Sequence, residues 1–144
     1  MKKDNIFSTV DLRSTPLREE MITLFVNHQG IAFSEAEING MFSQPFDRVT
    51  VYRTIKTFLG KLIIHKVICE DGVLRYAITE QQQNKLYHPH FQCTACGTVS
   101  CLTEKGLSRV SLPEGYRTRE LHMLIKGICS QCSNNPKADT HETL

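Results

Sequence analysis

Two Cys-x-x-Cys pairs limit how this chain can fold more than any other feature of its sequence. The first pair is Cys93 and Cys96, and the second is Cys129 and Cys132. One tight turn can present both thiolates of a pair to one ion, and four thiolates from two turns suit tetrahedral zinc. We therefore predict one structural zinc ion per chain, which would hold two distant segments together. Two unrelated surface thiol pairs are the weaker interpretation, because two matched pairs in one chain indicate a shared ion. A thioredoxin-like redox motif fits less well still, because no βαβ pattern surrounds either pair.

The composition and the N-terminal sequence indicate in which cellular compartment the protein is found. The chain has 144 residues, 40% of them hydrophobic, enough for one ordinary domain or two small ones. The opening "MKKDNIFSTVDL" lacks the apolar stretch of a signal peptide, and no apolar run approaches the ~18 residues of a membrane span. We expect a cytoplasmic protein without a membrane partner. Because thiols are kept reduced there, metal ligation is favoured over disulfides.

The first half of the chain has the spacing of three helices followed by a β-hairpin. The predicted helices run from Thr15 to about Asn27, from Ser34 to Phe42 and from Asp47 to about Gly60. Each begins at a capping residue, and Pro16 and Glu37 strengthen the first two starts. The strand patterns "LIIHKVIC" and "LRYAIT" flank the turn residues "EDG". This order is typical of a winged helix-turn-helix, whose last helix enters the major groove of DNA.

The polar stretch "QQQNKLY", residues 81–87, indicates a linker, so we place a boundary near residue 84. Beyond it the pattern indicates short strands around the cysteine pairs. The polar segment 133–144 is expected to be a flexible tail. The sequence therefore predicts an α+β chain with its two cysteine pairs in the second half.

Other soft metal ligands lie near the first cysteine pair. They are His88, His90, Cys101 and His122. His88 and His90 are two residues apart, so on a strand they face the same side and can share an ion. A second metal site built from some of these four is one interpretation; satisfied structural histidines and a buried cysteine are the other. We expect His65, on the hairpin, to be solvated.

The charge of the chain is uneven. The formal net charge is only +2, but residues 47–66 hold five basic residues against Asp47 alone, a local net charge of +4. A basic helix face is a better indication of nucleic-acid contact than global charge. This segment includes the last of the three predicted helices.

Three stretches together resemble the ferric uptake regulator (Fur) family. They are "TVYRTIKTFLGKLI" at residues 50–63, "HPHFQCTACGTVSCL" at residues 88–102 and "GICSQC" at residues 127–132. The resemblance covers roughly residues 10–132. It implies a winged-helix DNA-binding domain at residues 1–83, a hinge at 84–87, and a small α/β dimerisation and metal-binding domain at 88–132, with Cys93, Cys96, Cys129 and Cys132 as the structural zinc site.

The resemblance also implies which residues contact DNA. Tyr52 and Arg53 match the recognition helix of the family, and Thr50 and Lys56 belong to the same helix. Arg18 matches an arginine of an early turn, here written "TPLR", and Arg13 falls where the family places a basic residue that can reach the minor groove. An arginine offers a planar fork to guanine or phosphate.

The sequence departs from the family at the sensing site. The usual histidine-rich run is reduced to "YHPH", Ala32 and Ala77 stand where ligands are common, and Cys101 replaces a common glutamate. The later histidine is displaced by one position, to His122. The remaining set of His88, His90, Cys101 and His122 is softer than the one associated with ferrous iron, so the resemblance favours the zinc-sensing branch and zinc over iron as a second, regulatory ion.

Together these observations predict a homodimeric, metal-dependent repressor of metal homeostasis genes that binds a pseudo-palindromic operator in double-stranded DNA. Two alternatives stay open: a family member with only structural zinc and no metal sensing, and a zinc-thiol redox switch. An enzyme with a small-molecule substrate is not expected. The zinc-deaminase pattern needs His-x-Glu and a proline before the cysteine pair, whereas "HPH" lacks the glutamate and Gln92 precedes Cys93.

Overall fold

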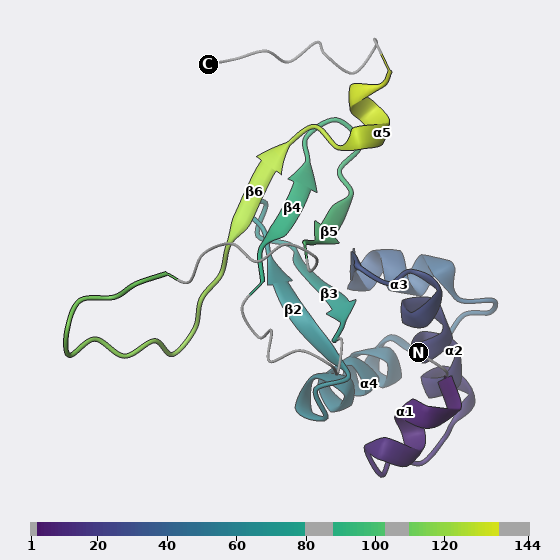
Figure 1. The fold of residues 1–144 in the computed structure, drawn as a ribbon. Helices are drawn as coiled ribbons and strands as arrows, with labels where there is room; N and C mark the ends of the chain where they lie inside the picture. The colour runs from purple at the N-terminus through teal and green to yellow at the C-terminus, as the bar shows by residue number, and fades with distance from the viewer. Residues whose placement is uncertain (1–2, 80–87, 103–109, 136–144) are drawn as a thin grey trace.

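The computed structural model describes residues 3–79, 88–102 and 110–135 and has a mixed α+β fold (Figure 1). Its helices are α1 (Lys3–Thr9), α2 (Pro16–Asn27), α3 (Glu35–Met41), α4 (Arg48–Gly60) and α5 (Ser130–Ser133). Its strands are β1 (Ile31–Ser34), β2 (Ile64–Ile68), β3 (Leu74–Ile78), β4 (His90–Cys93), β5 (Val99–Cys101) and β6 (Leu124–Gly127). No helix within these ranges is long and apolar enough to cross a membrane.

The three predicted helices and the hairpin are confirmed, and side chains cap each helix as expected. The Thr15 hydroxyl accepts a backbone N–H of the first turn of α2. At α3, the Ser34 hydroxyl accepts the Glu37 N–H (3.2 Å) and the Glu37 carboxylate accepts the Ser34 N–H (2.7 Å). At α4, the Asp47 carboxylate accepts the Thr50 N–H (3.0 Å). These bonds satisfy donors that a helix start leaves unpaired.

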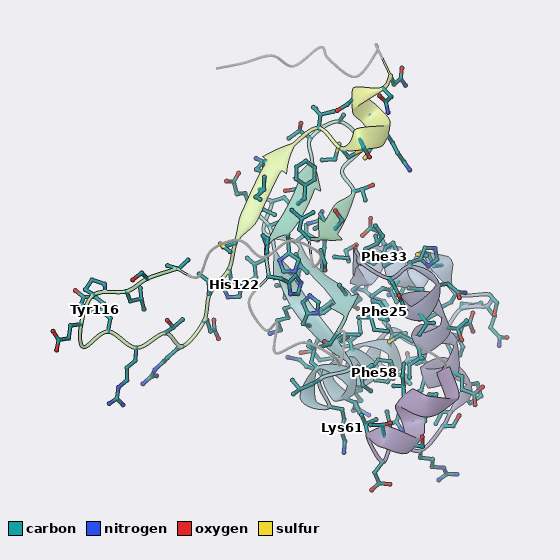
Figure 2. The ribbon with its side chains drawn as sticks, viewed as in Figure 1. Phe25, Phe33, Phe58, Lys61, Tyr116 and His122 are labelled. Carbon is teal, nitrogen blue, oxygen red and sulfur yellow. The ribbon has the colours of Figure 1, made fainter. Side chains whose placement is uncertain are left out.

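Helices α2, α3 and α4 pack on the β2–β3 hairpin around the larger of two apolar cores (Figure 2). Its most deeply buried side chains are Met21, Ile22, Phe25, Ile38, Val51, Ile55, Phe58 and Ile64. The buried positions of α4 recur at helical spacing, so the opposite side of this helix is exposed. The core therefore fixes which face of α4 is available to a partner.

Six strands of the described ranges form one sheet, in the order β2-β3-β1-β5-β4-β6. Strand β6 runs parallel to β4, and the other neighbouring pairs are antiparallel. Strand β1, which the sequence did not predict, joins the first half (residues 3–79) to the second half (residues 88–135). It pairs with β3 on one side, and on the other places Ala32 opposite Val99 of β5.

A second, smaller core covers this junction. Ala32, Val67, Cys69, Ala77 and Val99 are all at most 5% exposed and come from four strands, or their ends, on both sides of the junction. An ion pair between Lys126 Nζ of β6 and the carboxylate of Glu70, in the hairpin turn, also crosses this junction (2.8 Å). The two halves are therefore packed together. The predicted hinge at 84–87 and most of the predicted tail lie outside the described residues.

The capping box of α3 provides a test of the local fold. Ser34→Ala removes the hydroxyl that accepts the Glu37 N–H, so we expect the free energy of unfolding to fall by about 1 kcal/mol. Urea denaturation followed by circular dichroism measures this loss. Ser34→Thr keeps a capping hydroxyl and is the matched control. Equal stability of the alanine variant and the wild type would contradict this account of how α3 begins.

Candidate functional site

The four cysteines of the two pairs meet at one end of the sheet. Cys93 ends β4 and is buried, and Cys96 lies in the turn that follows. Cys129 directly precedes α5, and Cys132 lies within this helix. Their sulfur atoms all lie within 4.8 Å of one another, with Cys96 Sγ and Cys129 Sγ 4.0 Å apart. Gly97, at φ +78°, gives the first turn its left-handed residue. The sequence prediction that the two pairs converge is confirmed by this geometry.

The thiols of this cluster have unequal acidities. The backbone N–H groups of Cys96 and Cys129 point at Cys93 Sγ (3.5 and 3.4 Å) and lower the pKa of this thiol to about 6. A hydrogen bond with Thr98 lowers the pKa of Cys96, whereas contact with Cys129 raises the pKa of Cys132 to about 12. The site thus stabilises its first thiolate but opposes the last. A divalent cation would remove that opposition, because it deprotonates the thiols that coordinate it.

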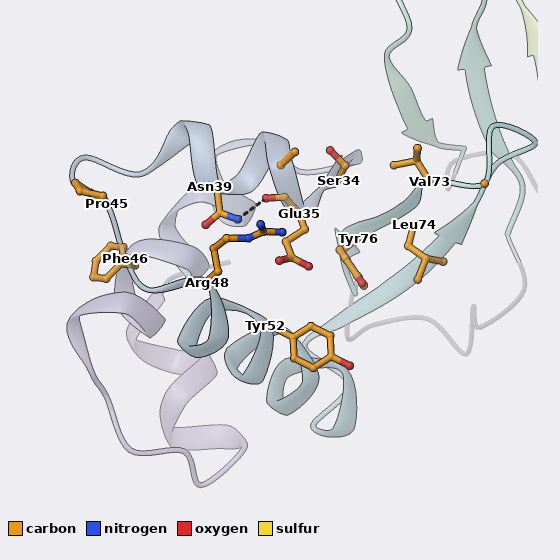
Figure 3. Close-up of a pocket in the computed structure, with 12 residues that line it drawn as sticks. Ser34, Glu35, Asn39, Pro45, Phe46, Arg48, Tyr52, Val73, Leu74 and Tyr76 are labelled. Atoms are coloured by element: carbon orange, nitrogen blue, oxygen red, sulfur yellow. Dashed lines mark hydrogen bonds between the residues drawn. The ribbon is translucent and has the colours of Figure 1, made fainter.

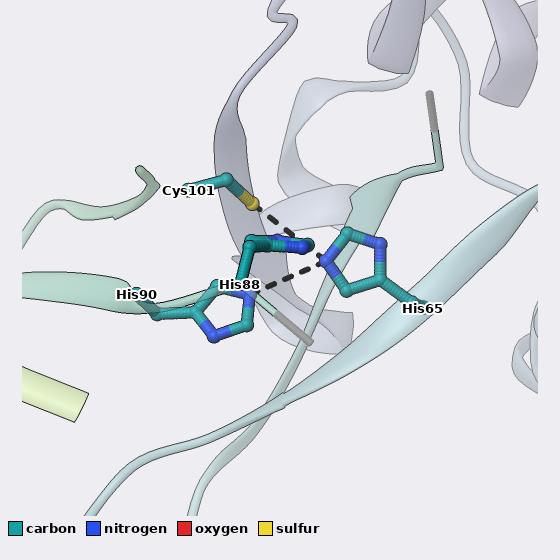
Figure 4. A group of neighbouring side chains, drawn as sticks. All are labelled: His65, His88, His90 and Cys101. Carbon is teal, nitrogen blue, oxygen red and sulfur yellow. Dashed lines mark hydrogen bonds between the residues drawn. The ribbon is translucent and has the colours of Figure 1, made fainter. Parts of the chain in front are cut away.

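A second cluster lies near the junction of the two halves (Figure 4). It contains His65 of β2, His88 just before β4, His90 of β4 and Cys101 of β5. One donor atom of each lies within 4.8 Å of the other three. His65 Nε2 is 3.3 Å from His90 Nε2 and 3.7 Å from Cys101 Sγ. The register places His90 directly opposite Cys101.

These distances fit a tetrahedral ion. Zinc bonds of ~2.1 Å to nitrogen and ~2.3 Å to sulfur place neighbouring ligand atoms roughly 3.4 to 3.8 Å apart. The separations of 3.3 and 3.7 Å around His65 Nε2 are close to this range. In the thiol cluster all sulfur atoms lie within 4.8 Å of one another, and the Cys96–Cys129 pair, at 4.0 Å, comes near to it. Both donor sets therefore fit zinc in number, chemical type and spacing.

His65 corrects the sequence analysis, which expected this side chain to be solvated. It is partly buried, and burial, reinforced by His88 and His90, lowers its pKa to about 3. Its partner across the hairpin is Ala77, the position at which the resemblance leads us to expect a ligand. His65 thus offers a donor atom from the strand next to that position. His65 Nδ1 lies 3.4 Å from the Thr79 hydroxyl, a contact that can fix the ring with Nε2 toward the cluster.

His122 does not join the cluster. Its side chain is exposed and lies 3.3 Å from the Glu120 carboxylate, just before β6 begins (Figure 2). Its place in the predicted sensing set is taken by His65, whereas His88, His90 and Cys101 meet as predicted. His122 lies outside β6, so the alternation of side chains along a strand does not direct it toward the cluster.

The predicted DNA-contacting residues lie on two segments. Tyr52, Arg53 and Lys56 are exposed on α4, and Lys56 Nζ lies 5.4 Å from the centre of the Tyr52 ring. The hydroxyl of Thr50 is also on this helix but bonds to the Asp47 carboxylate (3.1 Å). Near the start of α2, the Arg18 guanidinium donates to the Arg13 carbonyl (2.9 Å) and so fixes the backbone that carries Arg13.

A cleft of about 880 Å³ opens between α3, α4 and β3 (Figure 3). Arg48 and Tyr52 of α4 line one side, Leu74 and Tyr76 of β3 another, and Glu35 begins α3 beside them. Burial, with a smaller effect of the Glu35 carboxylate, raises the pKa of the Tyr76 hydroxyl. The cleft therefore lies between the exposed face of α4 and strand β3 of the hairpin.

The sequence is similar to a known family over most of its length. The model of the ferric uptake regulator family matches residues 9–125. The chain belongs to the ferric uptake regulator family. A ferric uptake regulation protein of Synechococcus elongatus is 27% identical over 131 residues, which cover 85% of this chain and 87% of that protein. Members of the family are transcription regulators and not enzymes, as the sequence predicted.

Solved structures of ferric uptake regulators and their relatives share the fold. A zinc uptake regulator complexed with zinc and DNA has a TM-score of 0.65 at 20% identity, covering 91% of this chain and 90% of its own. The Vibrio cholerae ferric uptake regulator has a TM-score of 0.63 at 15% identity, covering 89% of this chain and 100% of its own. At these identities the likeness supports the mixed α+β fold.

The low pKa values in the second cluster predict how stability depends on pH. Burial first, then nearby histidines, lower the pKa of His65 to about 3 and of His90 to about 4, from 6.5. At pH values between 6.5 and these lowered pKa values, the unfolded chain binds more protons than the folded chain does. The metal-free protein should therefore lose stability as the pH falls from about 6.5 toward 4. The slope is at most about 1.4 kcal/mol per pH unit for each histidine.

Urea denaturation of metal-free protein at a series of pH values measures this dependence. His65→Asn removes one of the two groups, so its stability should fall less steeply with acidification than that of the wild type. His122→Asn removes only the smallest of the three effects that lower the pKa of His90 and should change the slope much less than His65→Asn does. Parallel curves for the wild type and His65→Asn would contradict the burial of an uncharged His65.

Proposed function

We propose that this chain is a metal-dependent DNA-binding repressor of metal homeostasis genes, acting as a homodimer in the cytoplasm. The observation that carries the proposal is the meeting of His65 with His88, His90 and Cys101. His65 belongs to the half that carries α4, and the other three ligands belong to the half that carries the thiol cluster. An ion bound by all four residues would therefore connect the half that carries α4 to the half that carries the thiol cluster.

Cys93, Cys96, Cys129 and Cys132 are proposed to hold a structural zinc ion. Two of these thiols come from the end of β4 and the following turn, and two from the segment after β6. The Thr94 N–H donates to the Gly127 carbonyl (2.8 Å), so backbone bonding already joins the two turns. Few of the apolar side chains described in the second half are buried, so apolar packing contributes little stability there. A zinc ion held by four thiolates would stabilise this half instead.

The second cluster is proposed to hold a regulatory ion, zinc in preference to ferrous iron. Three imidazoles and a thiolate are softer than a set containing carboxylates. An ion bound there favours the arrangement in which His65 of β2 faces His90 of β4 and Cys101 of β5, to the extent that it binds that arrangement more tightly than others. The softness of the donors supports the zinc-sensing branch of the family.

DNA binding is assigned to the first half. In this proposal α3 and α4 form the helix-turn-helix, the β2–β3 hairpin is the wing, and α4 enters the major groove. Tyr52, Arg53 and Lys56 are exposed on α4, on the side opposite its buried residues. Arg13 lies on a separate segment, as a residue directed at the minor groove would.

The second half offers a surface for a second copy of the chain. Strand β6 is the last strand of the sheet, so one of its edges has no neighbour within the described ranges. The segment before it, residues 110–123, extends away from the sheet and exposes Val110, Leu112 and Tyr116 (Figures 1 and 2). Uncovered apolar side chains beside a strand edge support dimerisation, and a two-fold dimer fits a pseudo-palindromic operator.

The number of bound ions tests the two sites. Elemental analysis of protein purified with zinc should give two ions per chain, since there are two donor clusters. His65→Ala should reduce the count to one, because three ligands hold zinc less tightly than four. His122→Ala is the matched control and should keep both ions. One ion in the wild type would leave the protein with structural zinc alone.

DNA binding tests the regulatory role. Gel-shift titration on the DNA upstream of the protein's own gene should show tighter binding with zinc than after mild chelation, by about tenfold given typical coupling energies. His65→Ala should abolish this zinc dependence, and His122→Ala should keep it. Specific binding that ignores chelation would remove the sensing role only. The absence of specific binding in every condition would contradict the DNA-binding function itself.

A further inference from the structure

Val49 in the first turn of α4 exposes an apolar side chain that the fold does not use. It is 54% exposed, and neither apolar cluster of the described ranges includes it. A β-branched residue is also a weaker helix former than alanine or lysine. Neither packing nor helix propensity therefore accounts for a valine at this position.

The position of Val49 on the helix is more informative. Val49, Tyr52, Arg53 and Lys56 follow the spacing i, i+3, i+4 and i+7, so they share one helix face. All four are exposed, whereas Val51, Ile55 and Phe58 face the core. Val49 is the aliphatic member of an otherwise polar and basic face. It lies at the N-terminal end of α4, the end of a recognition helix that contacts base edges.

The chemistry of the major groove offers one apolar partner for such a side chain. Adenine, guanine and cytosine present hydrogen-bonding groups there, while thymine alone adds a C5 methyl group. An arginine one turn along the same face, Arg53, is suited to guanine. A valine beside it would add an apolar contact that distinguishes a thymine from the other bases.

We propose that Val49 is a specificity-determining residue that reads the methyl group of a thymine in each half of the operator. This inference rests on the proposed DNA-binding function. It adds to that function a direct contact that neither the basic residues nor the metal clusters supply. Replacement of the methyl group by hydrogen should therefore weaken binding only while Val49 is present.

Deoxyuridine substitution tests the contact, because it deletes the thymine methyl group and leaves base pairing and the minor groove unchanged. The probe is a duplex that the zinc-loaded protein selects from a random-sequence pool. Each symmetric pair of thymines is replaced in turn, and the affinity is measured for the wild type and for Val49→Ala. The wild type should lose roughly fourfold in affinity per methyl group at one such pair, the equivalent of about 0.8 kcal/mol, and Val49→Ala should lose nothing there.

Leu62→Ala is the matched control, since Leu62 is also an exposed aliphatic residue (65%) outside both apolar clusters but lies beyond the end of α4. It should keep the wild-type response to every substitution. A thymine read by Tyr52 would stay sensitive in Val49→Ala, so the two contacts are separable. If Val49→Ala keeps the wild-type sensitivity at every thymine, or if the wild type is sensitive at none, the inference is overturned while DNA binding stands. If the wild type selects no duplex, both the inference and the proposed function fail.

Discussion

The pairing of β1 with β5 is the interaction on which the rest of this structure depends. Strand β1 lies in the middle of the sheet, bonded to β3 of the first half and to β5 of the second. The Cys101 N–H also donates to the Gly30 carbonyl just before β1 (2.7 Å). Small side chains fill the junction, and Ala32 and Ala77 leave room for the strands to pack closely. This pairing holds the β2–β3 hairpin and the β4–β5 strands in one sheet, and so places His65 near His88, His90 and Cys101.

Most of the local structure could be predicted, because local chemistry determines it. Thr15, Ser34 and Asp47 cap their helices through bonds within a few residues, and the turn "EDG" closes a hairpin between adjacent segments. The two cysteine pairs also converge as predicted, since both follow strand ends. Strand β1 was missed because it has only four residues, directly after a helix and Gly30, and its role depends on partners far away in the sequence.

The candidate sensing site shows where prediction from sequence stops. His88, His90 and Cys101 were identified from spacing and resemblance, but His65 was not, because its role depends on strand order. The hairpin register places His65 opposite Ala77, where the resemblance leads us to expect a ligand, and this pairing could have drawn attention to His65. That His65 then faces β4 and β5 follows only from the tertiary arrangement. Tertiary burial also sets the pKa values of His65 and His90, which sequence cannot give.

The ion pair between Lys126 and Glu70 has a consequence for the orientation of the hairpin. The hairpin is already joined to the second half through the pairing of β3, β1 and β5 and through the smaller apolar core. Glu70 lies beyond the end of β2 that is remote from His65, so the ion pair adds an attachment at the tip of the hairpin. Both side chains are substantially exposed, and such pairs contribute only about 0.2 to 1 kcal/mol and weaken with added salt. The position of the hairpin tip relative to β6 would therefore depend weakly on ionic strength.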